Sequence, residues 1–206
     1  MASLLHIKVK SKLKYNRDTR IIVVAIAFYA SACLGYLLTF DKSAVPIWPP
    51  AGVGFALLMI LGRQAWPGIM IGSLIAGLMS GWNNNALPVD SVIAILTFTA
   101  IAHTAEALVG CWLVKYWIRD AYPFKTSRGA FQFLFVAVLM CVVGAILANF
   151  ILYSSKAISE DQLLTVSLSW LIGNIVGVLL FAPLILSLAR RNSFRFSPEQ
   201  ALEVSL

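Results

Sequence analysis

Charge is scarce in this sequence. Only 12% of its 206 residues are Asp, Glu, Lys or Arg, whereas 60% are hydrophobic. Soluble domains contain roughly 25% charged residues, so the charged share here is about half of the usual value. The mean hydropathy is +0.84. These values exclude an ordinary soluble enzyme and a disordered chain, and we expect an integral membrane protein.

Motifs of soluble catalysis are absent as well. The sequence has no phosphate-binding glycine loop, no zinc-ligand spacing and no nucleophile motif. Its three cysteines, Cys33, Cys111 and Cys141, lie in or near apolar stretches, where we expect buried small hydrophobic side chains rather than disulfides. We expect this chain to have no catalytic activity and to hold no cofactor or metal.

Long apolar runs are what the sequence has in abundance. A helix that crosses a membrane needs about 17–25 mainly apolar residues. Six stretches meet or approach this length, which predicts an all-α, polytopic transmembrane helix bundle. The predicted spans are residues 21–40, 47–62, 66–82, 91–117, 130–153 and 163–189. The second and third are short for a straight crossing, because they reach only about 24–26 Å at about 1.5 Å per residue.

Lys and Arg are distributed unequally between the loops. With six crossings, fourteen of the sixteen fall on one side, and only Lys42 and Lys156 fall on the other. The positive-inside rule then predicts that both termini are cytoplasmic. The net charge of +7 would favour a nucleic-acid partner in a soluble domain. Here topology accounts for it, so we expect the lipid bilayer and no nucleic acid.

These spans divide the chain into three segments. Residues 1–20 are predicted to be a basic cytoplasmic leader, 21–189 the transmembrane bundle, and 190–206 a cytoplasmic tail. Within the tail, Ser197 as N-cap and Pro198 at the first helical position predict the start of a further helix. A helix that begins there and is not completed indicates a fragment of a longer protein.

The two short spans open alike, with Trp48-Pro49 and Trp66-Pro67. Proline in the first turn begins a helix without losing a hydrogen bond. Trp48 falls at the outer end of its span and Trp66 at the inner end, as in an aromatic belt at the membrane interfaces. Short spans interrupted by Pro and Gly indicate either a binding site between helices or a tight, tilted helical hairpin.

Two polar groups lie in the fourth span. His103 and Glu106 are three residues apart and therefore share one face of a helix. A carboxylate at the centre of a membrane costs roughly 2.5–3.5 kcal/mol, so Glu106 is expected to face the bundle, paired or protonated. The pair is either a ligand or proton site or a buried pair that fixes helix packing.

The sixth span contains Trp170, Gly173, Asn174, Gly177 and Pro183. The two glycines are four residues apart, which allows close approach of another helix. Asn174 lies beside them and is expected to bond a neighbouring helix or a ligand. Pro183 leaves a carbonyl one turn earlier without its donor and is expected to bend the helix.

Several segments together resemble a known family. They are residues 47–54 (IWPPAGVG), 61–72 (LGRQAWPGIMIG), 105–110 (AEALVG) and 170–184 (WLIGNIVGVLLFAPL). These segments are similar to the membrane-associated sensor domains of the first type. The match touches the second, third, fourth and sixth spans. It departs from the family at Asn174, where the family often has an acid.

The resemblance implies an integral sensor domain at the N-terminus of bacterial signalling proteins, in the inner membrane. The usual cytoplasmic outputs of such proteins are diguanylate cyclases with a GGDEF motif, cyclic-di-GMP phosphodiesterases or histidine kinases. The family has about eight spans, two more than the six predicted here. Its ligands are mostly undefined, so the resemblance implies a role without a molecule.

We therefore expect a sensory module that couples a small-molecule ligand or a membrane protein to a cytoplasmic output. The expected site residues are Glu106, His103, Asn174, Trp48, Pro49 and Trp170. A homodimer is expected, because cyclases and kinases act as dimers. The alternative is a small-molecule transporter or its substrate-binding membrane subunit, since short Gly- and Pro-rich spans with polar groups at mid-membrane fit that class too.

Overall fold

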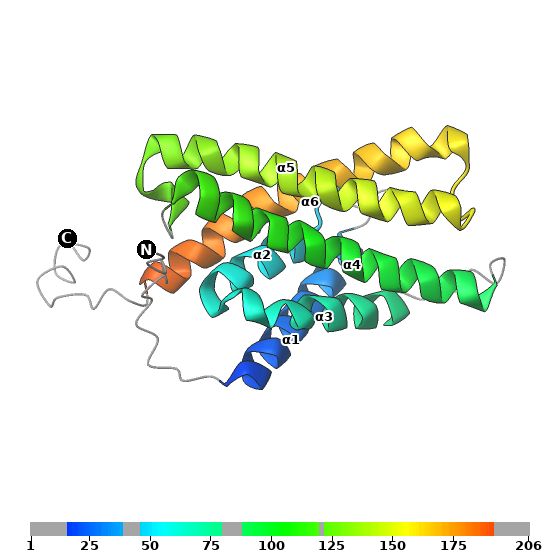
Figure 1. The fold of residues 1–206 in the computed structure, drawn as a ribbon, viewed down its shortest axis with the longest axis horizontal. Coiled ribbons are helices and arrows are strands. Elements are labelled where there is room, and N and C mark those ends of the chain that lie inside the picture. Colours follow the sequence, from blue (N-terminus) through cyan, green and yellow to red (C-terminus); the bar gives the residue numbers. More distant parts are fainter. Residues whose placement is uncertain (1–15, 39–45, 80–87, 120–121, 192–206) are drawn as a thin grey trace, which may run out of the picture.

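The described part of the chain is all-helical. The computed structural model describes residues 16–38, 46–79, 88–119 and 122–191. Its α-helices are α1 (Arg17–Leu37), α2 (Pro49–Leu61), α3 (Trp66–Met79), α4 (Val89–Leu113), α5 (Ser127–Ser154) and α6 (Glu160–Arg191) (Figure 1). Most of the predicted basic leader and the predicted helix start at Ser197 lie outside the described residues.

Four helices are long and apolar enough to cross a membrane. They are α1 with 21 residues, α4 together with its short π-helical extension η2 (Val114–Ile118) with 30, α5 with 28 and α6 with 32. They coincide with the first, fourth, fifth and sixth predicted spans. The other two helices, α2 and α3, have only 13 and 14 residues.

The long helices begin two to four residues before the predicted spans, and side-chain caps extend α1 and α5 past the apolar run. At the start of α1, Oδ1 of Asn16 accepts a hydrogen bond from the backbone N–H of Thr19 at 2.8 Å. At the start of α5, Oγ1 of Thr126 accepts from the N–H of Gly129 at 3.1 Å. Such caps satisfy N–H groups that have no partner inside the helix.

The short helices α2 and α3 pack on different neighbours. Proline begins α2, and Gly62 ends it with φ of 98°, a conformation that suits glycine. After the short segment η1 (Arg63–Ala65), α3 follows directly. However, α2 packs mainly against α6 and α3 mainly against α1. The prediction of a tight α2–α3 hairpin is therefore wrong in its packing, although the two helices are consecutive.

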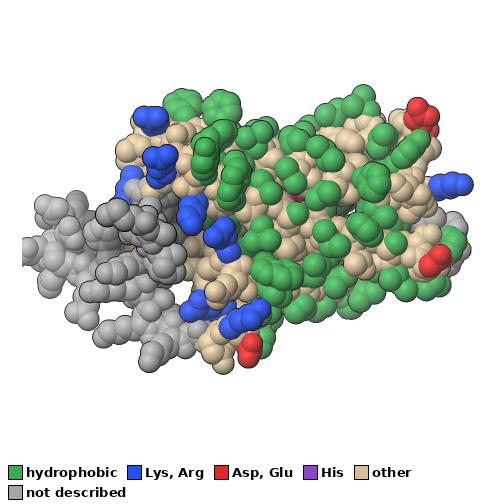
Figure 2. All heavy atoms as spheres, in the orientation of Figure 1, with side chains coloured by type: hydrophobic (Ala, Val, Ile, Leu, Met, Phe, Trp, Pro, Cys, Tyr) green, Lys and Arg blue, Asp and Glu red, His purple; other side chains and the backbone are tan. Residues whose placement is uncertain are grey.

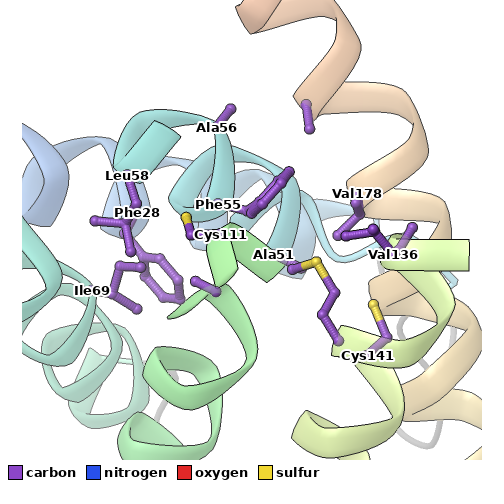
Figure 3. Packing of buried hydrophobic residues seen from close by; sticks show 14 of the residues in the cluster. Phe28, Ala51, Phe55, Ala56, Leu58, Ile69, Cys111, Val136, Cys141 and Val178 are labelled. Carbon is purple, nitrogen blue, oxygen red and sulfur yellow. The ribbon is translucent and has the colours of Figure 1, made fainter. Parts of the chain in front are cut away.

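The larger of two buried hydrophobic clusters in the described part of the chain joins the bundle. Figure 3 shows side chains from all six α-helices in this cluster, including Phe28 of α1, Phe55 of α2, Ile69 of α3, Cys111 of α4 and Val178 of α6. Cys141 of α5 lies in it too, so Cys111 and Cys141 are buried as the sequence predicts, whereas Cys33 is only partly buried. All three cysteines are free thiols.

The longest helix, α6, contains Pro183 in its interior. Proline has no N–H, so the carbonyl of Leu179 receives no hydrogen bond from that position. The described helix nevertheless continues to Arg191.

Charged side chains gather at the ends of the bundle. The beginning of α1 and the end of α6 lie at the same end (Figure 1). Figure 2 shows Lys and Arg side chains gathered there and hydrophobic side chains over the rest of the visible face. Exposed basic residues of the described part at this end include Arg17, Arg63, Lys125, Arg128 and Arg190.

Candidate functional site

The predicted polar residues of α4 lie on its buried face. His103 is 6% exposed and Glu106 is 1% exposed, and Gly110 continues this face one turn further. The spacing of three and four residues places all three on one side of the helix. Glu106 is thus among the most deeply buried side chains of the described protein.

Hydrogen bonds connect Glu106 to two other helices. Nδ2 of Asn174, on α6, donates to Oε2 of Glu106 at 2.8 Å. Sγ of Cys141, on α5, donates to Oε1 at 3.3 Å. The carboxyl group therefore links α4, α5 and α6 through neutral donors.

A glycine of α5 makes room for this carboxyl group. A Cβ atom added to Gly144 would overlap Oε2 of Glu106 and lie 2.9 Å from its Cδ. Any larger residue at this position must displace the carboxyl group, so Gly144 belongs to the site by its shape alone.

Three aromatic rings form a second layer next to the Glu106–Asn174 hydrogen bond. The ring of His103 stacks on Trp48 at a centroid distance of 5.9 Å and on Trp170 at 5.5 Å. Trp170 precedes Asn174 by one turn of α6, just as His103 precedes Glu106 on α4. We call Trp48, His103 and Trp170 the ring stack.

Trp48 is part of the interior rather than of an aromatic belt. It is 9% exposed, and its backbone N–H donates to the carbonyl of Gly173 at 2.9 Å. The belt position predicted for Trp48 is therefore wrong, because close approach of α2 to α6 at Gly177 draws its ring into the bundle. Pro49, the first residue of α2, is buried beside it. Trp66, the corresponding tryptophan at the start of α3, is in contrast 39% exposed.

Of the four ring nitrogens in the ring stack, one is hydrogen-bonded and three are not. Nδ1 of His103 shares a hydrogen bond with Oγ of Ser73 at 2.9 Å. In contrast, Nε2 of His103 and Nε1 of both Trp48 and Trp170 are buried without a partner. Leaving a buried polar group unpaired costs about 1–3 kcal/mol.

All six predicted site residues thus lie close together, in two adjacent layers between α2, α4 and α6. Sequence analysis missed Ser73, Cys141 and Gly144 as members. Ser73 and Cys141 are small residues of apolar spans, which predicts packing alone. A single glycine such as Gly144 gives no signal of the side chain that it faces.

The site offers hydrogen-bond donors, one carboxyl group and aromatic surface. Within the described residues, no cluster of three His, Cys, Asp or Glu side chains could hold a metal ion. The arrangement can bind a molecule or respond to one by rearranging side chains between helices.

Comparison with known proteins gives one family. The family model MASE1 matches residues 19–206, which is most of the chain. No curated protein and no solved structure matches the chain. The match includes every residue of the two site layers.

Proposed function

Since this chain belongs to the MASE1 family of membrane-integral sensor domains, we propose that it detects a ligand or a membrane partner through its two polar layers. The family is sensory and non-catalytic, and the chain is a multi-pass membrane protein of signalling systems. The finer proposal is that occupancy of the site changes the packing of α4 against α6 and thereby alters a cytoplasmic output. That output is a diguanylate cyclase, a cyclic-di-GMP phosphodiesterase or a histidine kinase.

The buried Glu106–Asn174 hydrogen bond carries this proposal. It joins residues 68 positions apart, and Glu106 is 1% exposed. Packing alone does not require a carboxyl group in an apolar interior, where it costs roughly 2.5–3.5 kcal/mol. A site that changes state can use it, because the bond is present in one packing and broken in another. Only a ligand with unequal affinity for the two packings shifts their populations.

We further propose six crossings with both termini in the cytoplasm, and a homodimer. The uneven distribution of Lys and Arg supports this orientation. So does the position of the start of α1 and the end of α6 at one end of the bundle. The homodimer is proposed because diguanylate cyclases and histidine kinases act as dimers. Residues 190–206 would then lead toward the output.

The proposal is tested by joining a diguanylate cyclase reporter after residue 206 and measuring cyclic di-GMP in cells. Glu106→Gln keeps the size of the side chain but changes its charge and bonding. We expect it to change the output about fivefold or more, since allosteric coupling energies have this size. Asn174→Ala, which removes the partner, is expected to shift the output in the same direction.

Thr97→Val is the matched control. Thr97 lies on the exposed face of α4, and its Oγ1 donates to the carbonyl of Ile93 in the same helix at 2.8 Å. We expect this variant to leave the output unchanged. Equal output from Glu106→Gln, Asn174→Ala and the unmodified protein, with normal membrane levels of each, would contradict the proposed role of the pair.

A transporter remains the second candidate because of α2. This helix of 13 residues begins against Gly173, near the middle of the 32-residue α6, instead of at the end of the bundle. Short helices that begin inside a bundle are common at transporter binding sites. Net uptake of a labelled solute into proteoliposomes that contain this chain would favour transport over sensing.

A further inference from the structure

The unpaired nitrogens of the ring stack point to the chemistry of a ligand. Within the described residues, four buried side-chain atoms lack a hydrogen-bond partner, and three of them are ring nitrogens of Trp48, His103 and Trp170. An indole N–H can only donate. The two tryptophans therefore present two donors, and an occupant that satisfies them must supply acceptor atoms, most simply oxygens.

The neighbouring layer disfavours a negative charge on that occupant. Glu106 lies one turn from His103, and both of its oxygens accept hydrogen bonds from the neutral groups of Cys141 and Asn174. An anionic ligand would be buried there without a Lys or Arg among the two layers to pair with it, and burying an unpaired charge is costly. An uncharged acceptor, such as a carbonyl oxygen, avoids this cost.

The surface next to Trp170 is apolar. Trp170 is only partly buried, and it packs with Val166 against the buried side chains of Ile95, Ile151 and Leu152. In a membrane protein such surface contacts the hydrocarbon of the bilayer. A ligand dissolved in the lipid therefore reaches the ring stack along the exposed part of Trp170.

We propose that the ring stack binds a lipid-soluble carbonyl compound of the quinone class. Its carbonyl oxygens accept hydrogen bonds from the indole N–H groups of Trp48 and Trp170. This inference rests on the proposed function, because it names the ligand class of the same site. Both indole N–H groups are buried, and their rings lie against His103 at centroid distances of 5.9 and 5.5 Å, so binding must part the stack. A ligand that binds only the parted stack shifts the bundle toward that packing.

The test observes the indole N–H groups directly. The full chain is labelled with ¹⁵N at the tryptophan indole nitrogens, placed in lipid nanodiscs and titrated with decylubiquinone. Trp48→Phe and Trp170→Phe assign their two signals among those of the six tryptophans. We expect saturable downfield shifts of the Trp48 and Trp170 N–H protons. The signal of Trp112, which is 53% exposed on α4, serves as the internal control for quinone in the lipid.

Two variants test whether quinone binding depends on the indole N–H groups of the ring stack. Trp170→Phe keeps an aromatic ring but removes one donor, and we expect the affinity measured at Trp48 to fall about tenfold. Trp66→Phe is the matched control outside the ring stack, and its affinity should equal that of the unmodified chain. If Trp170→Phe fails to fold, the saturation of the Trp48 and Trp170 signals in the unmodified chain still decides the result.

Three results would overturn the inference. The first is that all tryptophan signals move together without saturation, which means partition into lipid only. The second is that benzoate, a water-soluble carboxylate, shifts the two signals and decylubiquinone does not. The third is that neither probe shifts them. If any of these occurs while Glu106→Gln still changes the cyclic di-GMP output, the ligand class is wrong and the proposed function stands.

Discussion

At the scale of single residues, the packing around Glu106 shows how a buried carboxyl group is tolerated. Gly144 leaves the space that its oxygen occupies, and Asn174 and Cys141 supply donors from two sides. Buried polar groups are stable only when they are hydrogen-bonded. The surroundings of Glu106 therefore depend on three residues from two other helices, and each of them is a point at which the site can be damaged.

Gly144→Ala is expected to destabilise the protein. The new Cβ overlaps Oε2 of Glu106, so the carboxyl group must move and its bond to Asn174 is lost or distorted. Overpacking of this kind costs about 1–3 kcal/mol in the free energy of unfolding. The loss is measured by unfolding in detergent micelles.

Gly77→Ala is the control for that variant. Its Cβ would meet Cδ2 of Leu96, the flexible end of a side chain that can rotate away. We expect a smaller loss than for Gly144→Ala. Equal losses for the two variants would mean that the carboxyl group of Glu106 adapts freely, against the packing described above.

Sequence alone predicts part of this site. Polar side chains are scarce in the apolar spans, which singles out His103, Glu106 and Asn174. A polar group in a membrane interior is costly and therefore marks a packing or binding role. The pairing of Glu106 with Asn174 is not predictable in this way. The two residues lie 68 positions apart, and helical periodicity relates only positions within one helix.

At the scale of elements, the crossing of α2 and α6 depends on glycine. A Cβ on Gly177 would overlap the carbonyl oxygen of Trp48, and a Cβ on Gly52 would overlap the carbonyl oxygen of Gly177. Each glycine therefore meets backbone, which cannot rotate away as a side chain can. The approach of the two backbones sets where Trp48 enters the ring stack.

Gly177→Ala is expected to separate α2 from α6. The loss in the free energy of unfolding should reach about 1–3 kcal/mol or more, since the clash involves backbone on the other helix. Gly54→Ala is the control on α2, because its Cβ would lie 3.2 Å from the side chains of Ile69 and Phe28. Thermal unfolding in nanodiscs compares the two. A larger loss for Gly54→Ala would contradict the importance of the crossing.

The helices themselves were predictable to different degrees. Apolar length identifies α1, α4, α5 and α6, because crossing a membrane demands it. The partners of α2 and α3 were not predictable, since both are hydrophobic on most sides and their sequences favour no particular neighbour. The π-helical segment η2 also leaves no sequence signal, because it differs from an α-helix only in its hydrogen bonds.

At the scale of the whole molecule, aromatic contacts extend from the core to the end of α6. Phe55 of α2 contacts Phe133 of α5 at 6.1 Å between centroids, and Phe133 contacts Phe124 at 4.8 Å. Phe124 contacts Tyr122 at 5.4 Å. The guanidinium of Arg190, in the last turn of α6, lies 4.6 Å from the centre of the Tyr122 ring. This row joins α2, which begins at the ring stack, to the end of the bundle.

Tyr122→Phe is expected to weaken the link between this row and α6 without unfolding the protein. The variant removes only the hydroxyl group that shares a hydrogen bond of 3.0 Å with Oγ of Ser187. In the cyclase reporter, we expect the effect of Glu106→Gln on output to shrink about twofold or more, because coupling energies are lost when a connecting contact is removed. An unchanged effect in the Tyr122→Phe background would exclude this hydrogen bond from the coupling.

The orientation of the bundle is tested with two matched single changes. Ser127→Cys introduces a thiol at the start of α5, and Ser159→Cys introduces one just before α6, at the opposite end of α5. A membrane-impermeant maleimide added to intact cells is expected to label Ser159→Cys at least about tenfold more than Ser127→Cys, if positive loops are inside. The native protein, with Cys111 and Cys141 buried and Cys33 partly buried, provides the blank for labelling of native thiols. Stronger labelling of Ser127→Cys would contradict the proposed orientation.

Pro183 allows the last part of α6 to tilt relative to the rest of the helix. From Pro183 to Arg191 the helix rises about 12 Å at about 1.5 Å per residue. Because the backbone hydrogen bond to Leu179 is missing, this arm can tilt more cheaply than an uninterrupted helix. A tilt of about 10° would move its tip by about 2 Å, the size of the helix shifts that carry signals between subunits. A tilt of this size in response to a side-chain change in the interior would therefore displace the end of α6.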